Sequence, residues 1–414
     1  MREKVTSAAA TPVTVGFAGL THAGIVGALA AAAQGARVIA FDPDMTLVAR
    51  LKQGDVPVVA PVLIQSASVD YTATAADLSQ CDVVFFSADV PASEKGRSDL
   101  TALQALLDDA APAARQEAVL VISSPVPPGF SRCQTRAGRA LYYLLDTLAI
   151  DEDVERANAP KRLFVGCADS SAPLPRTLQR FFELFGCPVQ PMRYESAELA
   201  RFGLALMRVA GDHAASLVSD LSEKVEATRE EVGAVLGAAP TSAANGPGVE
   251  RDLAILRRLA EKQGVDASLI ESGLARVRQQ QDWVLQCLDG QVLKNSPDAR
   301  LAILGLASRQ GTRSIDESPA LALLASLPKL PVRVYDPAVS ADPSWHGGLE
   351  AATDALDACR DADAVVIMTP WREFAALDLE ALAGRMRGKV IIDPYRVLEP
   401  GPVRQAGLAL HTPS

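Results

Sequence analysis

Short apolar runs alternate with helix-like stretches along the N-terminal third of the chain. Residues 13–17 form an apolar run that leads through a turn of small residues at 18–24 into a helical stretch at 25–34. Further apolar runs follow at 37–42, 82–86 and 119–123. Short apolar strands that alternate with helices predict a parallel, doubly wound sheet covered on both faces.

The C-terminal part of the chain repeats this pattern. Its apolar runs lie at 301–307, 332–336, 364–368 and 389–393. In each half the second run ends in an Asp-Pro pair, at Asp42 and at Asp336. The repeat predicts an α/β fold with two Rossmann-like, doubly wound parallel-sheet domains.

The segment between the halves has the pattern of a long helix. From 196 to 232 the apolar residues recur with a period of 3.6 residues, up to Gly233. At ~1.5 Å per residue this helix would be on the order of 50 Å long, more than one domain needs. We therefore expect a bridge between the domains and a homodimer surface. The expected divisions are a flexible leader at 1–11, an N-terminal domain at 12–195, a central helical dimerisation domain at 196–292 and a C-terminal domain at 293–414.

A glycine-rich turn follows the first predicted strand and opens the first predicted helix. In the dinucleotide fingerprint G-x-G-x-x-G, the outer glycines make the turn and allow helix packing, and the middle one admits the pyrophosphate. Here the outer positions are Gly19 and Gly24, but the middle one is Thr21. A threonine there either crowds the phosphate or offers it a hydroxyl.

Asp42 lies where a carboxylate would hold the adenosine ribose of NAD and repel the 2′-phosphate of NADP. The alternative is a strand-ending acid without a ligand, and His22 is either a cofactor contact or a solvated turn residue. NAD is the predicted cofactor. The predicted cofactor-binding residues are Gly19, Leu20, Thr21, His22, Ala23, Gly24, Asp42, Ser87 and Ser124.

Composition narrows the classes of partner. The chain has 414 residues, and 40 basic against 50 acidic side chains give a net charge of −10. We expect no nucleic-acid partner and no membrane surface, because either needs a basic face. No stretch approaches the ~18 apolar residues of a membrane helix. The first residues lack the apolar core of a signal peptide, so we expect a cytoplasmic protein.

Metal and nucleophile motifs are missing from the sequence. The six cysteines are scattered and form no C-x-x-C pair, which predicts neither a disulfide framework nor a metal site. No serine lies in a G-x-S-x-G turn. No catalytic residue is therefore assigned from the motifs alone.

Several motifs, in order along nearly the whole chain, carry a family resemblance. Residues 96–100 are similar to G-R-P-D-L, 124–129 to S-T-V-P-P-G and 197–201 to A-E-L-A-K. Residues 246–249 resemble the start of a glycine-rich substrate loop, and two further motifs, G-L-A-Y-K…E-S-P-A and T-x-W-x-E-F, have counterparts at 305–320 and 369–374. With these motifs the chain resembles the nucleotide-sugar dehydrogenases, the UDP-glucose and UDP-N-acetylmannosamine 6-dehydrogenase family.

The resemblance implies NAD-dependent oxidation of a nucleotide sugar. The family oxidises a sugar C6 alcohol to a carboxylate with two NAD, and a cysteine in G-G-x-C-x-P-x-D carries the thiohemiacetal and thioester. A nucleotide sugar is therefore the expected small-molecule partner. The substrate-binding residues that the resemblance implies are Arg201, Gly246, Gly248 and Arg309.

The family's catalytic positions are substituted in this chain. In register with the motif, the cysteine position is Leu253 and the aspartate position is Arg257, and the glycine pair is Glu250 and Arg251. The remaining departures are Arg201 for the central-helix lysine, Ala205 for the asparagine, Lys161 for the S-P-E glutamate, Pro125 for a threonine and Ser308-Arg309 for the Y-K pair.

An arginine cannot exchange protons at neutral pH, so Arg201 does not replace the lysine as an acid or base. Three interpretations remain open. The first is an oxidoreductase with altered chemistry, such as a single reversible hydride transfer. The second is a non-catalytic relative that binds NAD or a sugar nucleotide as a regulator or scaffold. The third is a folded dimer whose ligand sites have decayed. The substitutions argue against four-electron oxidation in every case.

Overall fold

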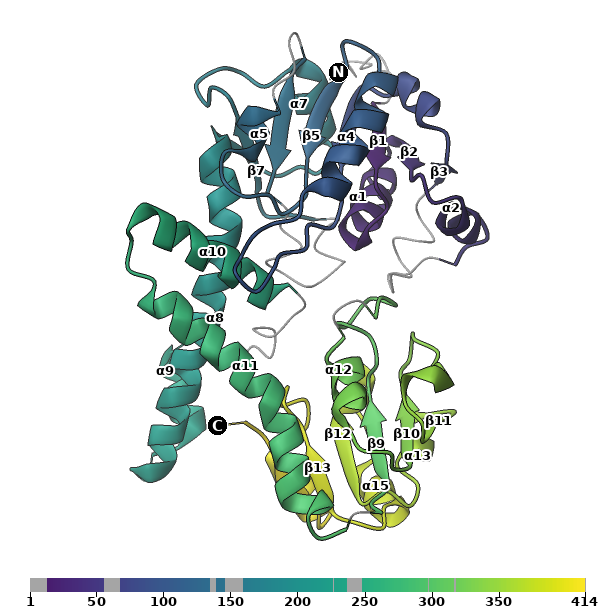
Figure 1. Cartoon of the computed structure of the whole chain (residues 1–414), viewed down its shortest axis with the longest axis vertical. Coiled ribbons are helices and arrows are strands. Elements are labelled where there is room, and N and C mark those ends of the chain that lie inside the picture. Colours follow the sequence, from purple (N-terminus) through teal and green to yellow (C-terminus); the bar gives the residue numbers. More distant parts are fainter. Residues whose placement is uncertain are drawn as a thin grey trace, which may run out of the picture. The chain divides into compact units, whose positions relative to one another are not determined.

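The computed structural model describes residues 13–55, 68–134, 139–145, 159–225, 227–236, 248–296, 298–315 and 318–413. The chain divides into two compact units. Unit 1 comprises Met1–Ser93 and Arg97–Phe202, and unit 2 comprises Glu94–Gly96 and Gly203–Ser414 (Figure 1). The finer three-part division expected from the sequence stays a prediction.

Unit 1 is built on an eight-stranded sheet in the order β3-β2-β1-β4-β5-β6-β7-β8. Its strands are β1 (Thr14–Ala18), β2 (Arg37–Phe41), β3 (Val69–Thr72), β4 (Val83–Phe86), β5 (Val119–Ile122), β6 (Leu141–Leu144), β7 (Leu163–Cys167) and β8 (Val189–Arg193). Neighbouring strands are parallel except for β6 and β7. The carboxyl ends of β1, β2, β4 and β5 therefore meet at one edge.

Small residues bring the first helix close to this sheet. The helices of unit 1 are α1 (His22–Ala33), α2 (Met45–Lys52), α4 (Thr101–Ala113), α5 (Phe130–Cys133) and α7 (Arg176–Glu183), with a 3-10 helix at Ala75–Gln80. A Cβ added to Gly27 of α1 would lie 2.8 Å from the Phe17 ring. Phe17 in turn stacks on Phe85 with ring centroids 5.0 Å apart. The apolar runs read from the sequence are thus the core of the unit.

Unit 2 contains a six-stranded, wholly parallel sheet in the order β11-β10-β9-β12-β13-β14. Its strands are β9 (Leu301–Leu304), β10 (Val332–Tyr335), β11 (Leu349–Ala351), β12 (Ala364–Ile367), β13 (Val390–Ile392) and β14 (Ala409–His411). Its helices are α12 (Pro319–Ser326), α13 (Ala355–Ala358), α14 (Arg372–Ala375), α15 (Leu379–Arg385) and α16 (Pro400–Gln405), with a 3-10 helix at Pro343–Trp345. The prediction of two doubly wound parallel-sheet domains joined by a helical region is confirmed.

The segment between the two sheets is helical, as expected, but the long helix is shorter than predicted. The segment comprises α8 (Tyr194–Lys224), α9 (Arg229–Leu236), α10 (Val249–Gln263) and α11 (Ser268–Leu288). The last of these continues into a π-helical turn at Asp289–Leu293. The prediction of one helix from 196 to 232 is wrong, because α8 ends at Lys224 and α9 begins anew. The Ala227 N–H bonds back to the Ser222 carbonyl, and Thr228 accepts from the Val232 N–H in the first turn of α9. Threonine favours such a helix start.

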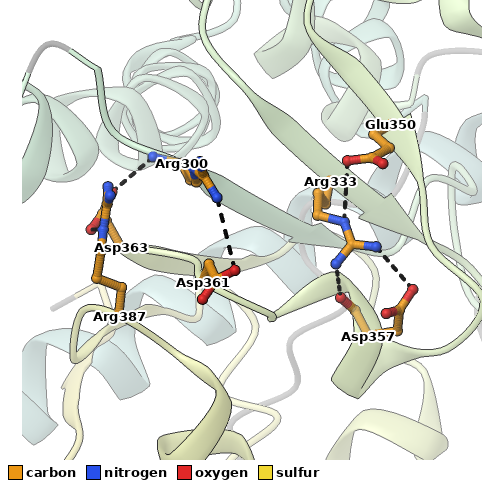
Figure 2. A network of polar contacts seen from close by, with 7 residues as sticks. All are labelled: Arg300, Arg333, Glu350, Asp357, Asp361, Asp363 and Arg387. Carbon is orange, nitrogen blue, oxygen red and sulfur yellow. Dashed lines mark hydrogen bonds and ion pairs between the residues drawn. The ribbon is translucent and has the colours of Figure 1, made fainter.

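Ion pairs close the amino ends of the strands in unit 2 (Figure 2). Asp363, just before β12, accepts the Arg300 backbone N–H at 2.8 Å and the Arg387 Nε–H at 2.6 Å. Beside it, Arg333 pairs with Glu350 at 3.4 Å and with Asp357 at 3.0 Å. These contacts tie neighbouring strand starts together.

Unit 1 has the same arrangement at the same place in its sheet. Asp82, just before β4, accepts the Thr14 backbone N–H at 2.9 Å and pairs with Arg115. Since the amino ends of both sheets are closed in this way, ligands are expected at the opposite, carboxyl ends of the strands.

Candidate active site

The glycine turn of unit 1 needs glycine at both outer positions. Gly19 has a φ of +85°, and a Cβ there would lie 2.0 Å from the Ser87 carbonyl oxygen. A Cβ on Gly24 would lie 2.2 Å from the Gly19 carbonyl oxygen. The strand, the turn and the start of α1 can approach this closely only without side chains.

Thr21, at the middle position of the fingerprint, is the N-cap of α1. Its hydroxyl accepts from the Gly24 N–H at 3.3 Å and lies 2.6 Å from the Ser87 hydroxyl. The side chain is therefore held along the strand ends by bonds within the chain. The first backbone N–H groups of α1, on His22 and Ala23, lie at the positive end of the helix dipole.

Asp42 connects the end of β2 to the glycine turn. Its Oδ2 accepts from the Leu20 N–H at 2.8 Å, and its Oδ1 from the Asp44 N–H at 2.9 Å. A carboxylate offers about four lone-pair sites, and Asp42 is half-buried, so acceptor capacity remains on its open side. Leu20 itself is buried.

Two buried serines continue the same edge across β4 and β5. Ser87 follows β4 and bonds to Thr21, and Ser124 follows β5 and accepts from the Ala88 N–H at 2.8 Å. The structure thus brings the predicted cofactor-binding residues together at the carboxyl ends of neighbouring strands of unit 1.

The region expected to hold the substrate loop is a helix instead. Gly248, with a φ of +87°, caps α10, which begins at Val249. Leu253, the fifth residue of α10, is fully buried in an apolar cluster with Val209, Ile270, Leu274 and Val277. Gly246 lies outside the described residues.

The next turn of α10 contacts the loop between β4 and α4. The Arg257 guanidinium donates to the Glu94 carbonyl at 2.9 Å, and a Cβ on Gly96 would lie 2.0 Å from the Ala254 carbonyl oxygen. Residues 94–96 therefore lie tightly on α10 and belong with it in unit 2. The helical spacing of Val249, Leu253, Leu256 and Ala260 was the sequence signal for this packing.

The other substituted positions are spread over the chain. Arg201 is half-buried on α8, Lys161 is exposed before β7, and Arg309 is half-buried in the segment after β9. No cysteine belongs to the cluster around Leu253. Burial raises the pKa of the Cys81 and Cys359 thiols to about 12. Among the described residues, no three His, Cys, Asp or Glu side chains are placed to hold a metal ion.

Family models match both sheets. Residues 13–141 match the UDP-glucose/GDP-mannose dehydrogenase family, NAD binding domain, and residues 302–400 match the UDP binding domain of that family. The chain belongs to this family.

Curated relatives and solved structures are similar over almost the full chain. A UDP-glucose 6-dehydrogenase of Pseudomonas aeruginosa is 26% identical, with 94% of each chain covered, and one of Rhizobium meliloti is 24% identical over 94% of this chain and 96% of its own. A UDP-glucose dehydrogenase structure from Pyrobaculum islandicum covers 98% of this chain and 100% of its own at 19% identity, with a TM-score of 0.76. A UDP-D-ManNAc dehydrogenase structure from Pyrococcus horikoshii covers 97% and 99% at 19% identity, with a TM-score of 0.72.

Membership in the UDP-glucose/GDP-mannose dehydrogenase family confirms NAD as the cofactor. The residues of unit 1 fit it. Asp42 has acceptor capacity for ribose hydroxyls, the glycine turn leaves the start of α1 accessible, and the Thr21 side chain is held by Ser87. The UDP-binding domain likewise supports a nucleotide sugar as ligand. No helix among the described residues has the length and hydropathy to cross a membrane.

Sequence reasoning missed two residues at these edges. Trp371, which follows β12, donates from its indole Nε1 to Asp336 at 3.0 Å. Glu198 on α8 is fully buried and accepts two backbone N–H groups at the start of α5. Both lie inside the family motifs at 369–374 and 197–201. The motifs do not indicate their contacts, because the bonded residues lie far away in the sequence.

Proposed function

We propose that this family member is an NAD-dependent oxidoreductase with altered chemistry, which acts on a CH–OH group of a nucleotide sugar and transfers at most one hydride per substrate. The observation that carries the proposal is Leu253. The residue in register with the family's nucleophile is fully buried in α10, where a side chain is not open to a substrate. Without a thiolate there is no covalent adduct from which a second hydride could leave.

In this proposal unit 1 supplies the cofactor site. The turn at Gly19–Gly24 and the carboxylate of Asp42 hold NAD, with Ser87 and Ser124 beyond them on the edge. The substrate contacts that the family resemblance implies for Arg201, Gly246, Gly248 and Arg309 stay predictions. Bound NAD⁺ supplies the hydride acceptor.

The proposed reaction is one two-electron oxidation. With bound NAD⁺ as the hydride acceptor, the alcohol C–H bond would be oxidised to a carbonyl with formation of NADH, and the hydroxyl proton would leave to water. Arg201 remains charged and does not take the proton. Its guanidinium is suited to a phosphate or to a developing negative charge.

A non-catalytic role is the second candidate, and the same residues favour it. The family's lysine and S-P-E glutamate are replaced by Arg201 and by Lys161, which is exposed. A chain that keeps the NAD site and loses the acid and base groups would bind NAD or a sugar nucleotide as a regulator or scaffold.

One titration separates the two candidates. The protein is incubated with NAD and a panel of UDP-sugars while thermal stability and the NADH absorbance band are followed. A ligand at ~100 times its dissociation constant should raise the free energy of unfolding by roughly 2.7 kcal/mol. Stabilisation with NADH formation supports the oxidoreductase, and stabilisation without NADH supports the binding role. No stabilisation by NAD or by any of the UDP-sugars contradicts both.

We also propose a homodimer formed through α8. Large apolar side chains are exposed along this helix and at the residue that follows it, namely Leu199, Met207, Leu217, Leu221 and Val225. Their spacing places them on one stripe within about 80° of the helix circumference at 100° per residue. A stripe of this length is best covered by the same stripe of a second copy.

Sedimentation at micromolar concentration tests the dimer. The unmodified protein should sediment as a dimer and Met207→Glu as a monomer. Met45→Glu is the matched control, because Met45 is exposed to 75% and Met207 to 72%, but Met45 lies on α2. A monomeric unmodified protein contradicts the proposal.

A further inference from the structure

The first turns of α8 hold the segment that starts α5. Glu198, which is fully buried, accepts the Gly129 N–H at 2.6 Å and the Ser131 N–H at 2.8 Å. Both partners lie about seventy residues earlier in the chain, as the separations of 69 and 67 show. Figure 1 shows α5 beside the start of this long helix. Burial raises the pKa of the Glu198 carboxyl, and the two N–H groups oppose this shift.

Two neighbouring residues of α8 make further contacts with the same part of unit 1. Glu195 forms a two-pronged pair with the Arg132 guanidinium, whose Nη2 lies 2.9 Å from Glu195 Oε2. Tyr194 donates its hydroxyl to the Leu141 carbonyl of β6, and its ring lies 5.5 Å from the Arg132 guanidinium carbon. Residues 194–198 of α8 therefore contact both α5 and β6.

Gly129, which bonds to Glu198, is the last residue of a proline-rich turn. Residues 124–129 read Ser-Pro-Val-Pro-Pro-Gly, and each proline fixes its own φ. Ser124, at the near end, is tied to the Ala88 N–H. A turn fixed at both ends has little freedom of its own, so a shift of Gly129 would be transmitted to Ser124 and to the strand edge.

The order of the strands indicates which half of a bound dinucleotide would lie at this turn. Asp42 follows β2, the glycine turn follows β1, Ser87 follows β4 and the proline-rich turn follows β5. If the adenosine ribose binds at Asp42 and the pyrophosphate at the start of α1, the nicotinamide half would extend toward β4 and β5.

We propose that Glu198 is a positioning residue that fixes the turn at 124–129 for the nicotinamide half of NAD. This role rests on the proposed function of unit 1 as the NAD site. Glu198 touches no ligand in this account. It acts through Gly129 and Ser131.

The test compares two substitutions on the same face of α8. Glu198→Gln keeps the size of the side chain but turns an amide NH₂ toward one of two N–H donors. Glu195→Gln, the matched control, loosens the partly exposed pair with Arg132 on the same helix. Calorimetry gives the dissociation constants of NAD and of ADP, which has the adenosine half only, and amide hydrogen exchange is followed on the ligand-free proteins.

Glu198→Gln should weaken NAD roughly tenfold, leave ADP within about twofold, and speed exchange at Gly129 and Ser131. Glu195→Gln should change both affinities by less than about twofold. Faster exchange with unchanged NAD affinity would show that Glu198 is structural only, and equal loss of NAD and ADP would show a general disturbance of the unit. Either result overturns the proposal.

Failure of the proposed function gives a different pattern. If the unmodified protein binds neither NAD nor ADP, the NAD site itself is refuted, and the role of Glu198 with it. If Glu198→Gln does not fold, Glu198→Asp, which is one methylene shorter and keeps its charge, takes its place. Unchanged NAD affinity in Glu198→Asp, together with faster exchange at Gly129, contradicts the proposal equally.

Discussion

The two sheets of this chain carry the same device at their carboxyl ends. Gly19 after β1 and Gly305 after β9 both have positive φ, and each donates its N–H to the last carbonyl of the neighbouring strand, at 2.9 and 2.8 Å. An aspartate follows that neighbouring strand in each sheet. Asp42 bonds to the Leu20 N–H, and Asp336 bonds to the Leu306 N–H.

The two aspartates differ in how many donors they already accept. Asp42 is half-buried and accepts two backbone N–H groups. Asp336 is buried and accepts five donors, which are the N–H groups of Leu306, Ala307, Ala338 and Val339 and the indole of Trp371. Asp336 therefore has no acceptor site left for a ribose hydroxyl, and Asp42 has.

This difference separates a ligand-binding role from a structural one at equivalent positions. In unit 1 the aspartate stays partly open at the edge where we propose that NAD binds. In the UDP-binding half the equivalent residue, Asp336, already accepts five hydrogen bonds from within the chain. A nucleotide there must therefore be recognised by other groups. A strand-Asp-Pro pattern alone does not distinguish the two cases, because the indole of Trp371 comes from far along the chain.

The largest expected effect is on stability and comes from Asp336. Asp336→Asn places an amide NH₂ against at least two N–H donors whichever way it turns, and should lower the free energy of unfolding by roughly 3 kcal/mol. Asp42→Asn meets one donor on each side and can use solvent, so we expect about 1 kcal/mol. Urea unfolding of both variants measures the difference, and equal losses would remove the contrast between the two halves.

The next effect is a pH dependence that comes from Asp393 in the C-terminal sheet. Asp393 follows β13 where Ser123 follows β5, and burial raises its pKa to about 6 against the N–H groups that it accepts. As pH rises from about 4 to about 6 the unfolded chain ionises this group before the folded chain does, so its contribution to stability falls. Two pKa units correspond to about 3 kcal/mol.

Asp393→Asn removes this titration. The free energy of unfolding of the unmodified protein, minus that of Asp393→Asn, should fall by about 2 kcal/mol between pH 4 and pH 7. Using the difference cancels carboxylates such as Asp363, whose pKa is lowered mainly by Arg387 and which act in the opposite direction. A difference that stays flat with pH would contradict the assignment.

The cofactor preference gives the third effect. Asp42→Ala should weaken NAD about tenfold and relax the preference over NADP, because a charged acceptor is lost and the repulsion of a 2′-phosphate with it. Calorimetry with both dinucleotides measures this. Asp44→Ala is the control, since Asp44 caps α2 through the Thr46 and Leu47 N–H groups. Equal affinity of the unmodified protein for NAD and NADP would show that Asp42 is misplaced.

The smallest effect should be the same in both halves. Arg115→Ala removes the ion-pair partner of Asp82, and Arg387→Ala removes that of Asp363. The side chains of Arg115 and Arg387 are 41% and 53% exposed, respectively. Each should cost about 1 kcal/mol or less, and the loss should shrink with added salt. Thermal unfolding at low and high salt measures it, and a large difference between the two would show that the halves do not share this device.

The sequence predicted the buried strands well and the exposed ones poorly. β1, β4 and β5 are almost wholly buried, so their apolar runs stand out. β3 and β8 are half-exposed and read VDYT and VQPMR, without a run that periodicity can detect. Their pairing depends on the neighbouring strand and not on their own composition.

The candidate site was predictable where it is local. The turn at Gly19–Gly24 is recognised from a run of consecutive residues. Asp42 is recognised because it follows the next strand along the chain. The burial of Leu253 could not be predicted from the sequence. The motif register predicts a catalytic loop at this position, whereas the apolar spacing of α10 predicts a core helix. Only tertiary packing decides between the two.

The most direct test of the account is the stoichiometry of oxidation. With NAD in excess and each UDP-sugar in turn, NADH and sugar acid are quantified for the unmodified protein and for Leu253→Cys. We predict at most one NADH per substrate and no carboxylate from either protein, because a thiol at 253 would lie in an apolar cluster where burial disfavours the thiolate. Two NADH per sugar acid from the unmodified protein, or robust acid formation appearing only in Leu253→Cys, would contradict the account.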